Sequence, residues 1–471
     1  MKKIGKSLSV ILMMLSALFV YACGGGGGGG AFGAPNSVQA IAGDQRVTVS
    51  WDEVPSANSY NVYWSNSSGS GTGGTKITGV TNPFYHDGVT NSTDYYYVVT
   101  AVNSAGESAP STEVNATPVD IAVSGLSFTD TNLAVCVTDT ANSSGITYVH
   151  EFVTLDCTYK NITDLGGIDA LTSLLDLVLE ENNISGAGSL SGLINLTALS
   201  LSENNISDVS PLSGLTSLTS LDISNNSISD AAPLSGLTNL TSLQISYNSI
   251  SDVSPLSGLT NLMSLNISNN SGISDVSALS GLINLTALSL SGNNISDVSP
   301  LSGLTSLTSL GISNNSISDA APLSGLTSLT SLSLYNNSIS DVSPLSGLTN
   351  LTSLNISNNG ISNVSPLSGL TNLMSLYLFN NSISDVSPLS GLTDLTSLHL
   401  GNNNIAGIGV GNVNSLVTLT SATTIYLSGN IGMSCSELGT LITTLGSPPV
   451  DTDFNFATSD VATDGVNCTN P

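Results

Sequence analysis

Between about residues 152 and 430, apolar and polar positions alternate in one phrase that returns every 22 residues. The phrase reads L-x-x-L-x-L/I-x-x-N-x-I-S-D, and LTSLDISNNSISD from Leu218 is a clear copy. A fixed period of this length is the sequence signature of a solenoid, in which each repeat forms one coil of a stack. Counting the copies predicts about thirteen coils.

Each copy places two apolar residues on either side of one polar residue, as Leu221 and Ile223 flank Asp222. This alternation is typical of a strand with one buried face, so each coil should add a short strand to a parallel sheet. Leucines such as Leu215 and Leu218 should close the opposite side through short turns or 3₁₀ segments. No coil can bury its apolar face alone, so the stack needs a cover at both ends.

An asparagine follows each strand at the same phase of the repeat. A carboxamide buried at that bend can satisfy backbone donors and acceptors of adjacent coils, so we predict a structural ladder and no ligand-binding role. The ladder residues are Asn182, Asn204, Asn226, Asn248, Asn270, Asn293, Asn315, Asn337, Asn359, Asn381, Asn403 and Asn430.

An aspartate follows the isoleucine of most copies, often as D-x-S-P, and its carboxylate suits the cap of a tight turn. Nine such carboxylates about 5 Å apart would repel one another, and calcium could relieve that repulsion. No calcium-loop motif is present, so capping is favoured, no cofactor is expected, and calcium stays the alternative. These residues are Asp164, Asp208, Asp230, Asp252, Asp275, Asp297, Asp319, Asp341 and Asp385, and Asn363 takes the position once.

The phrase resembles the leucine-rich repeats of internalin-like bacterial surface proteins, and the resemblance covers well over half of the chain. It implies a mainly β fold: a solenoid with a parallel sheet on its concave face and 3₁₀ or turn segments on its convex face. It also implies a protein that recognises a macromolecule.

The first 22 residues carry three lysines and then a short apolar run, the pattern of a cleaved export signal. The run ends in Val20-Tyr21-Ala22-Cys23, which resembles a bacterial lipobox and implies lipidation of Cys23; ordinary secretion with a chance cysteine is the alternative. Residues 23–33 contain a glycine run and form a flexible tether. Gly24 stands where an inner-membrane retention signal would have Asp, so we expect the outer membrane or cell surface.

Residues 34–119 lack the leucine period and contain short alternating runs such as QRVTVSW and DYYYVVTAV, which predict a small antiparallel sandwich. Trp51, Tyr60, Tyr63 and Tyr95 stand where this segment resembles a fibronectin type III domain. Trp51 and Tyr95 are then expected in the core and at the tyrosine corner. The domain is expected to act as a spacer.

The array, residues 160–430, has a predicted cap at each end. Residues 120–159 form a linker and an N-terminal cap with a short helix capped by Asp130 or Thr131, and residues 431–471 form the C-terminal cap. Cys136 and Cys157 flank the entrance, and Cys435 and Cys468 the exit. The pairing is open, but nearest-neighbour disulfides would fasten each cap; zinc is the alternative.

Charge limits the partners. The chain has six Lys and Arg against 33 Asp and Glu, for a net charge of −27. Because nucleic acid and anionic membrane surfaces need basic residues, both are excluded as partners, and any membrane contact is expected through the lipid alone.

Outward-facing strand residues should line the concave face, where a partner would bind. They are acidic near the entrance, at Glu180, Glu181, Glu203 and Asp222, and aromatic toward the exit. The aromatic candidates for partner binding are Tyr335, Tyr377, Phe379, His399 and Tyr426, of which Tyr377, His399 and Tyr426 share one column. Exposed aromatics are common binding anchors, although they could instead only stack and stabilise the sheet.

No catalytic motif accompanies the three histidines, so we expect no enzyme. The sequence therefore predicts a monomeric, lipid-anchored surface protein that binds a protein or glycan through the concave face, in adhesion or recognition. A structural strut without a specific ligand and an accessory carbohydrate-binding protein are the alternatives.

Overall fold

The computed structural model describes residues 33–405 and 414–430 together with Leu441 and Leu445. The predicted signal and tether, Cys23, Cys435, Cys468 and most of the predicted C-terminal cap lie outside these residues. The described chain forms two compact units, one built from residues 33–42, 47–86 and 92–117 and the other from residues 43–46, 87–91 and the described residues from Pro118 onward. Within the described residues no helix combines the length and apolar character needed to cross a bilayer.

The first unit is a β-sandwich of two antiparallel sheets, as the short alternating runs predict. One sheet has the order β1–β2–β5, and the other has the order β4–β3–β6–β7 with β8 also pairing with β6. Val47, Val62 and Tyr97 are fully buried between the sheets. The strands are β1 (Gln39–Ala42), β2 (Arg46–Ser50), β3 (Ser59–Ser65), β4 (Thr75–Val80), β5 (Phe84–Asp87), β6 (Tyr95–Asn103), β7 (Gly106–Glu107) and β8 (Val114–Ala116).

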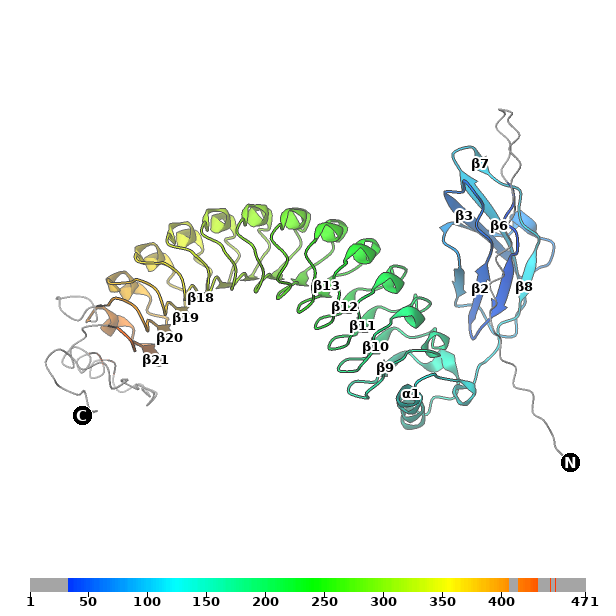
Figure 1. The fold of residues 1–471 in the computed structure, drawn as a ribbon, viewed down its shortest axis with the longest axis horizontal. Coiled ribbons are helices and arrows are strands. Elements are labelled where there is room, and N and C mark those ends of the chain that lie inside the picture. Colours follow the sequence, from blue (N-terminus) through cyan, green and yellow to red (C-terminus); the bar gives the residue numbers. More distant parts are fainter. Residues whose placement is uncertain (1–32, 406–413, 431–440, 442–444, 446–471) are drawn as a thin grey trace. The chain divides into compact units, whose positions relative to one another are not determined.

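The second unit is a solenoid whose thirteen short strands form one parallel sheet on the concave side (Figure 1). Leu221 pairs in register with Leu199 and Leu243, and this register repeats from coil to coil. The strands are β9 (Thr154–Asp156), β10 (Asp176–Val178), β11 (Ala198–Ser200), β12 (Ser220–Asp222), β13 (Ser242–Gln244), β14 (Ser264–Asn266), β15 (Ala287–Ser289), β16 (Ser309–Gly311), β17 (Ser331–Ser333), β18 (Ser353–Asn355), β19 (Ser375–Tyr377), β20 (Ser397–His399) and β21 (Thr424–Tyr426).

Short 3₁₀ turns form the convex side, where Leu212, Leu215 and Leu218 point inward and are fully buried with Leu221 and Ile223. The prediction of a parallel sheet opposite 3₁₀ turns is therefore confirmed. These turns are Ile168–Ala170, Gly188–Leu190, Ser210–Leu212, Ala232–Gly236, Ser254–Gly258, Ser277–Gly281, Ser299–Gly303, Ala321–Gly325, Ser343–Gly347, Ser365–Gly369, Ser387–Gly391 and Asn414–Thr418.

The repeated asparagines connect adjacent coils. Asn204 Nδ2 donates to the carbonyls of Leu179, Leu201 and Ser202 at 2.9–3.1 Å, and its Oδ1 accepts the Ile184 N–H at 2.9 Å. The other eleven asparagines, from Asn182 to Asn430, also donate through Nδ2 to strand carbonyls. Each side chain thus satisfies backbone groups that the bend would otherwise leave buried and unpaired.

A second ladder, of threonines, runs beside the sheet and was not predicted from the sequence. Thr219 Oγ1 donates to the Thr197 carbonyl at 3.0 Å, and Thr241 Oγ1 donates to the Thr219 carbonyl at 3.1 Å. Nine such bonds join coils along the array. The signal in the sequence is the threonine that follows the first leucine of most copies, as in LTSL.

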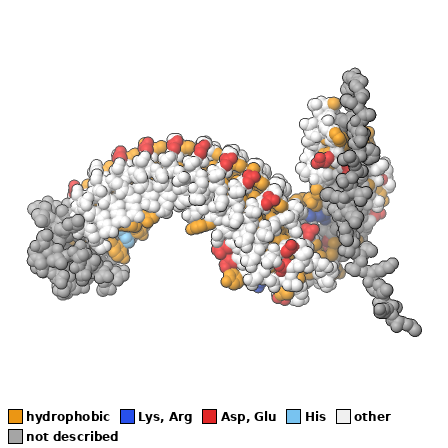
Figure 2. Space-filling model, viewed as in Figure 1, with side chains coloured by type: hydrophobic (Ala, Val, Ile, Leu, Met, Phe, Trp, Pro, Cys, Tyr) orange, Lys and Arg blue, Asp and Glu red, His pale blue; other side chains and the backbone are white. Residues whose placement is uncertain are grey.

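The row of aspartates lies along the convex edge, where Figure 2 shows acidic side chains at regular intervals. In all nine, Oδ1 accepts the backbone N–H two residues later, at 2.6–2.9 Å. At Asp252 the N–H of Ser254 lowers the pKa of the carboxyl below its usual value. These contacts are those of a turn cap, and Asn363 makes the same bond to Ser365 at 3.0 Å.

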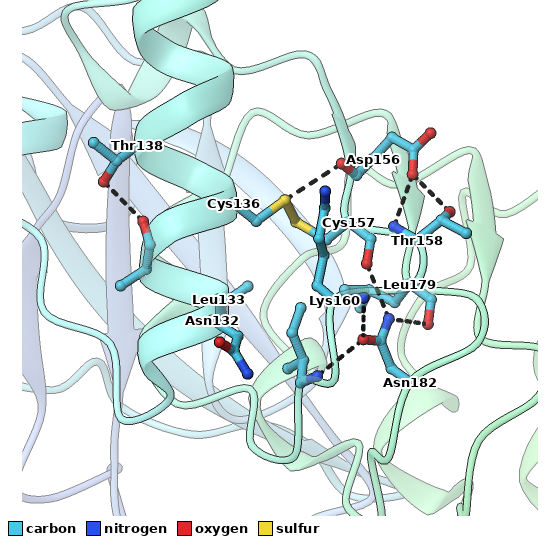
Figure 3. The surroundings of a disulfide bond; sticks show 12 residues. Asn132, Leu133, Cys136, Thr138, Asp156, Cys157, Thr158, Lys160, Leu179 and Asn182 are labelled. Atoms are coloured by element: carbon cyan, nitrogen blue, oxygen red, sulfur yellow. Dashed lines mark hydrogen bonds between the residues drawn. A yellow bond between two sulfur atoms is a disulfide. The ribbon is translucent and has the colours of Figure 1, made fainter.

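The N-terminal cap is helix α1 (Thr131–Ser144), which begins after Asp130 and ends at Gly145 with a φ of 71°. Its inner face buries Leu133 and Val137 against the first coil. A disulfide joins Cys136 of the helix to Cys157 just after β9 (Figure 3). Beside it, Asn182 Nδ2 donates to the Cys157 carbonyl at 2.9 Å, so the asparagine ladder begins at the cap.

Candidate recognition surface

Two columns of side chains cover the concave sheet. The central column holds the residue between the two inward-facing apolar residues of each coil, as Asp222 lies between Leu221 and Ile223. The flanking column holds the residue that follows the second apolar residue, as Ser224 follows Ile223. Because adjacent parallel strands lie about 4.8 Å apart, neighbours in a column can touch. The chemistry of the face can therefore be followed coil by coil.

The entry end of these columns is acidic. Glu180 Oε1 accepts a hydrogen bond from Ser200 Oγ at 2.6 Å, and Asp222 Oδ1 accepts the Ser224 N–H at 2.9 Å and its hydroxyl at 2.6 Å. Glu181 and Glu203 are exposed at the next position along the chain, where the backbone is left-handed. The predicted acidic patch is therefore made of solvated carboxylates and carboxylates bonded to local hydroxyls.

The rest of the two columns is uncharged. From Gln244 to Ser428 their described residues include no Asp, Glu, Lys or Arg, although the chain carries 33 acids. The acids of these coils lie at the convex edge, as Figure 2 shows. Charge is therefore separated between the two sides of the array.

Three aromatic rings form a continuous stack at the exit end. The ring centroids of Tyr377 and His399 are 4.6 Å apart, and those of His399 and Tyr426 are 4.2 Å apart. Strand pairing places the three residues directly side by side in β19, β20 and β21. Burial lowers the pKa of His399, which keeps its imidazole neutral at pH 7.

Tyr335 and Phe379 form a second pair, in the flanking column and two coils apart. Their ring centroids are 6.0 Å apart with a tilt of 42°. Ser357, from the coil between them, is fully buried and its Oγ has no hydrogen-bond partner in the described structure. An unpaired buried hydroxyl costs about 1–3 kcal/mol, so this serine is unfavourable in the free protein.

All five predicted aromatic residues thus lie at the exit end of the concave face, where Figure 2 shows apolar side chains and a histidine together. They are half-buried, whereas the sequence predicted exposed rings. The reason is that the rings cover one another. Ser357 was not predicted from the sequence, although its position in the column between Tyr335 and Phe379 could have identified it.

Known proteins share this architecture. A family model described as leucine rich repeats (2 copies) matches residues 194–236, 238–281, 283–325, 327–369 and 371–412. An internalin of Listeria monocytogenes, inlF, is 33% identical in a solved structure, with a TM-score of 0.57 over 69% of this chain and 89% of that chain. The chain therefore belongs to the leucine-rich-repeat proteins of the bacterial internalin type.

More distant structures share the fold. The functional domain of InlJ from Listeria monocytogenes, which includes a cysteine ladder, is 24% identical over 65% of this chain and 71% of its own, with a TM-score of 0.56. A leucine-rich-repeat protein of Leptospira interrogans is 22% identical over 62% of this chain and 81% of its own, with a TM-score of 0.52. A comparison with curated proteins finds no match.

Proposed function

We propose that this chain is a non-enzymatic recognition protein of the cell surface that binds a macromolecular partner through its concave sheet. The observation that carries the proposal is the aromatic stack of Tyr377, His399 and Tyr426 on an uncharged part of that sheet. Half-buried rings on a rigid platform lose little conformational entropy when a partner covers them, which makes them good anchors. The internalin-type fold supports a role in recognition or adhesion.

The rest of the chain would place this surface at a distance from the membrane. We propose that Cys23 carries a lipid, that the glycine run is a tether and that the sandwich is a fibronectin type III-like spacer. Trp51 and Tyr95 support the last assignment, since both are buried where that domain family has its core tryptophan and its tyrosine corner. The array itself would act as a monomer.

A triple variant tests the proposal. The full chain is coupled to beads and exposed to extracts of its own cells, of neighbouring bacteria and of host tissue. Replacing Tyr377, Phe379 and Tyr426 together by serine should reduce partner capture by at least about tenfold, because each lost aromatic anchor contributes about 1–2 kcal/mol.

The matched control replaces two exposed tyrosines away from the exit end, Tyr159 and Tyr247, which are 72% and 60% exposed, by serine. This control should capture the partner as well as the wild type does. If the array is a strut whose rings only stabilise the sheet, the triple variant will melt at a lower temperature than the wild type. In that case every molecule captured by the wild type will also be captured by both variants.

A further inference from the structure

Tyr335 and Phe379 flank Ser357 from the two neighbouring coils. Coils two apart in the stack are separated by about 10 Å, so side chains that stand straight up from the positions just after β17 and β19 would not touch. Their ring centroids are nevertheless 6.0 Å apart, which means that the two rings lean toward each other across the intervening coil. Ser357 lies in that coil and is fully buried.

The Ser357 hydroxyl differs from its counterparts in the flanking column. Ser268 Oγ pairs with Ser289 Oγ at 2.6 Å, and Ser313 Oγ pairs with Ser333 Oγ at 2.7 Å. The Oγ of Ser357 has no partner in the part of the chain that the structure describes. Since buried hydroxyls are nearly always paired, a hydroxyl of a bound ligand is a natural partner for Ser357 Oγ.

We propose that the Tyr335 and Phe379 rings part to hold one pyranose ring of a neutral glycan between them, with a sugar hydroxyl bonded to Ser357 Oγ. This inference rests on the proposed function and names its ligand class. The dimensions agree, because the spacing of about 10 Å between coils two apart leaves room for one sugar ring in contact with both aromatic faces once the rings part.

A sugar fits this site better than an apolar side chain of a protein. A pyranose has C–H faces that pack on aromatic rings and a rim of hydroxyls that can pair with Ser357 and with Asn355 beside it. A phenylalanine or leucine would fill the gap but leave the Ser357 hydroxyl unpaired. The ligand must also be neutral, because the described residues of the two columns, from Gln244 to Ser428, offer no Lys or Arg to an acidic sugar.

The aromatic stack extends the site. Phe379 and Tyr377 belong to the same coil, and the rings of His399 and Tyr426 continue from Tyr377 across β20 and β21. Further sugars of the same chain could therefore lie on these rings. His399 is neutral at pH 7, so the platform carries no charge.

The test measures the affinity of the purified full chain for soluble glucan, mannan and galactan, with polygalacturonate as the anionic comparison. At least one neutral polysaccharide should bind, and polygalacturonate should not. Replacing Tyr335 and Phe379 by serine should weaken binding at least about tenfold, whereas Tyr247→Asn, a control elsewhere on the array, should leave the affinity unchanged.

Ser357→Ala separates this role from a structural one. Without the unpaired hydroxyl the free protein should melt at the same temperature or higher, while the affinity for the glycan should fall about three- to tenfold with the lost hydrogen bond. An unchanged affinity together with the higher melting temperature would show that Ser357 is only an unfavourable buried residue, and the inference would be wrong.

The test of the glycan inference can be distinguished from the test of the proposed function. If the triple variant loses a captured partner but neutral polysaccharides do not bind, the partner is treated with glycosidases before capture. Loss of capture after this treatment would place the sugar on a glycoprotein and support the inference. Unchanged capture would identify a protein contact, so that the glycan inference fails while the proposed function holds.

Discussion

Replacing Asn204 by alanine is expected to lower the free energy of unfolding of the array by about 4 kcal/mol. The side chain makes hydrogen bonds to the Leu179, Leu201 and Ser202 carbonyls and to the Ile184 N–H, and it is 8% exposed. Alanine would leave these backbone groups buried and unpaired. Because the Leu179 and Ile184 bonds join two coils, the loss falls on the contact between neighbouring repeats.

Asn205 provides the control, since it is the next residue and has an exposed side chain. Asn205→Ala should change the free energy of unfolding by less than about 0.5 kcal/mol. Urea unfolding followed by circular dichroism compares the two variants. Equal and small effects would contradict the structural role of the ladder.

Asp130→Ala is expected to destabilise the entrance of the array by about 3 kcal/mol, because one carboxylate supports two elements. Its Oδ1 accepts the N–H groups of Asn132 and Leu133, at 2.8 and 3.2 Å, and so caps helix α1. Its Oδ2 accepts both the N–H and the hydroxyl of Thr163, each at 2.8 Å, and so holds the helix to the next coil. Asp139→Ala, at an exposed position of the same helix, should have little effect.

The effect of Asp130 should depend on pH. Partial burial acts to raise the pKa of this carboxyl, but the bonds from Thr163 and the helix N–H groups outweigh it and the pKa is lowered. The folded state then binds this proton less readily than the unfolded state does, so the carboxylate stabilises the fold above about pH 4 and loses that contribution below it. The stability difference between wild type and Asp130→Ala should therefore shrink as the pH falls toward 3. A difference that stays constant would show that the charge of Asp130 is unimportant.

The fold of the array could be predicted because the local pattern of apolar residues and the period of the repeat indicate the same structure. Leu221 and Ile223 alternate with polar neighbours, and the same alternation returns in each copy, so one repeat determines the strand, its inward face and its register. Helix α1 was likewise predictable from Asp130, whose side chain caps it. The pairing of Cys136 with Cys157 was left open, because spacing does not determine connectivity.

The features that could not be predicted from the sequence involve contacts between side chains of different coils. The lean of Tyr335 toward Phe379 involves two coils, and the period of the repeat says nothing about rotamers. The position that follows the flanking column is left-handed, which favours asparagine or glycine, yet four coils carry another residue there: Tyr159, Glu181, Glu203 and Tyr247. The repeat phrase predicts the backbone that the coils share. It does not predict which coils carry an unusual residue at a given position.

The most direct test of the central claim is oxidative footprinting of the full chain, free and bound to its captured partner, with oxidation measured for each residue by mass spectrometry. If the exit end of the concave sheet is the recognition surface, oxidation of Tyr377, Phe379 and Tyr426 should fall severalfold on binding. Oxidation of Tyr159 and Tyr247 should not change. Protection of Tyr159 and Tyr247 with no change at the exit end would contradict the account.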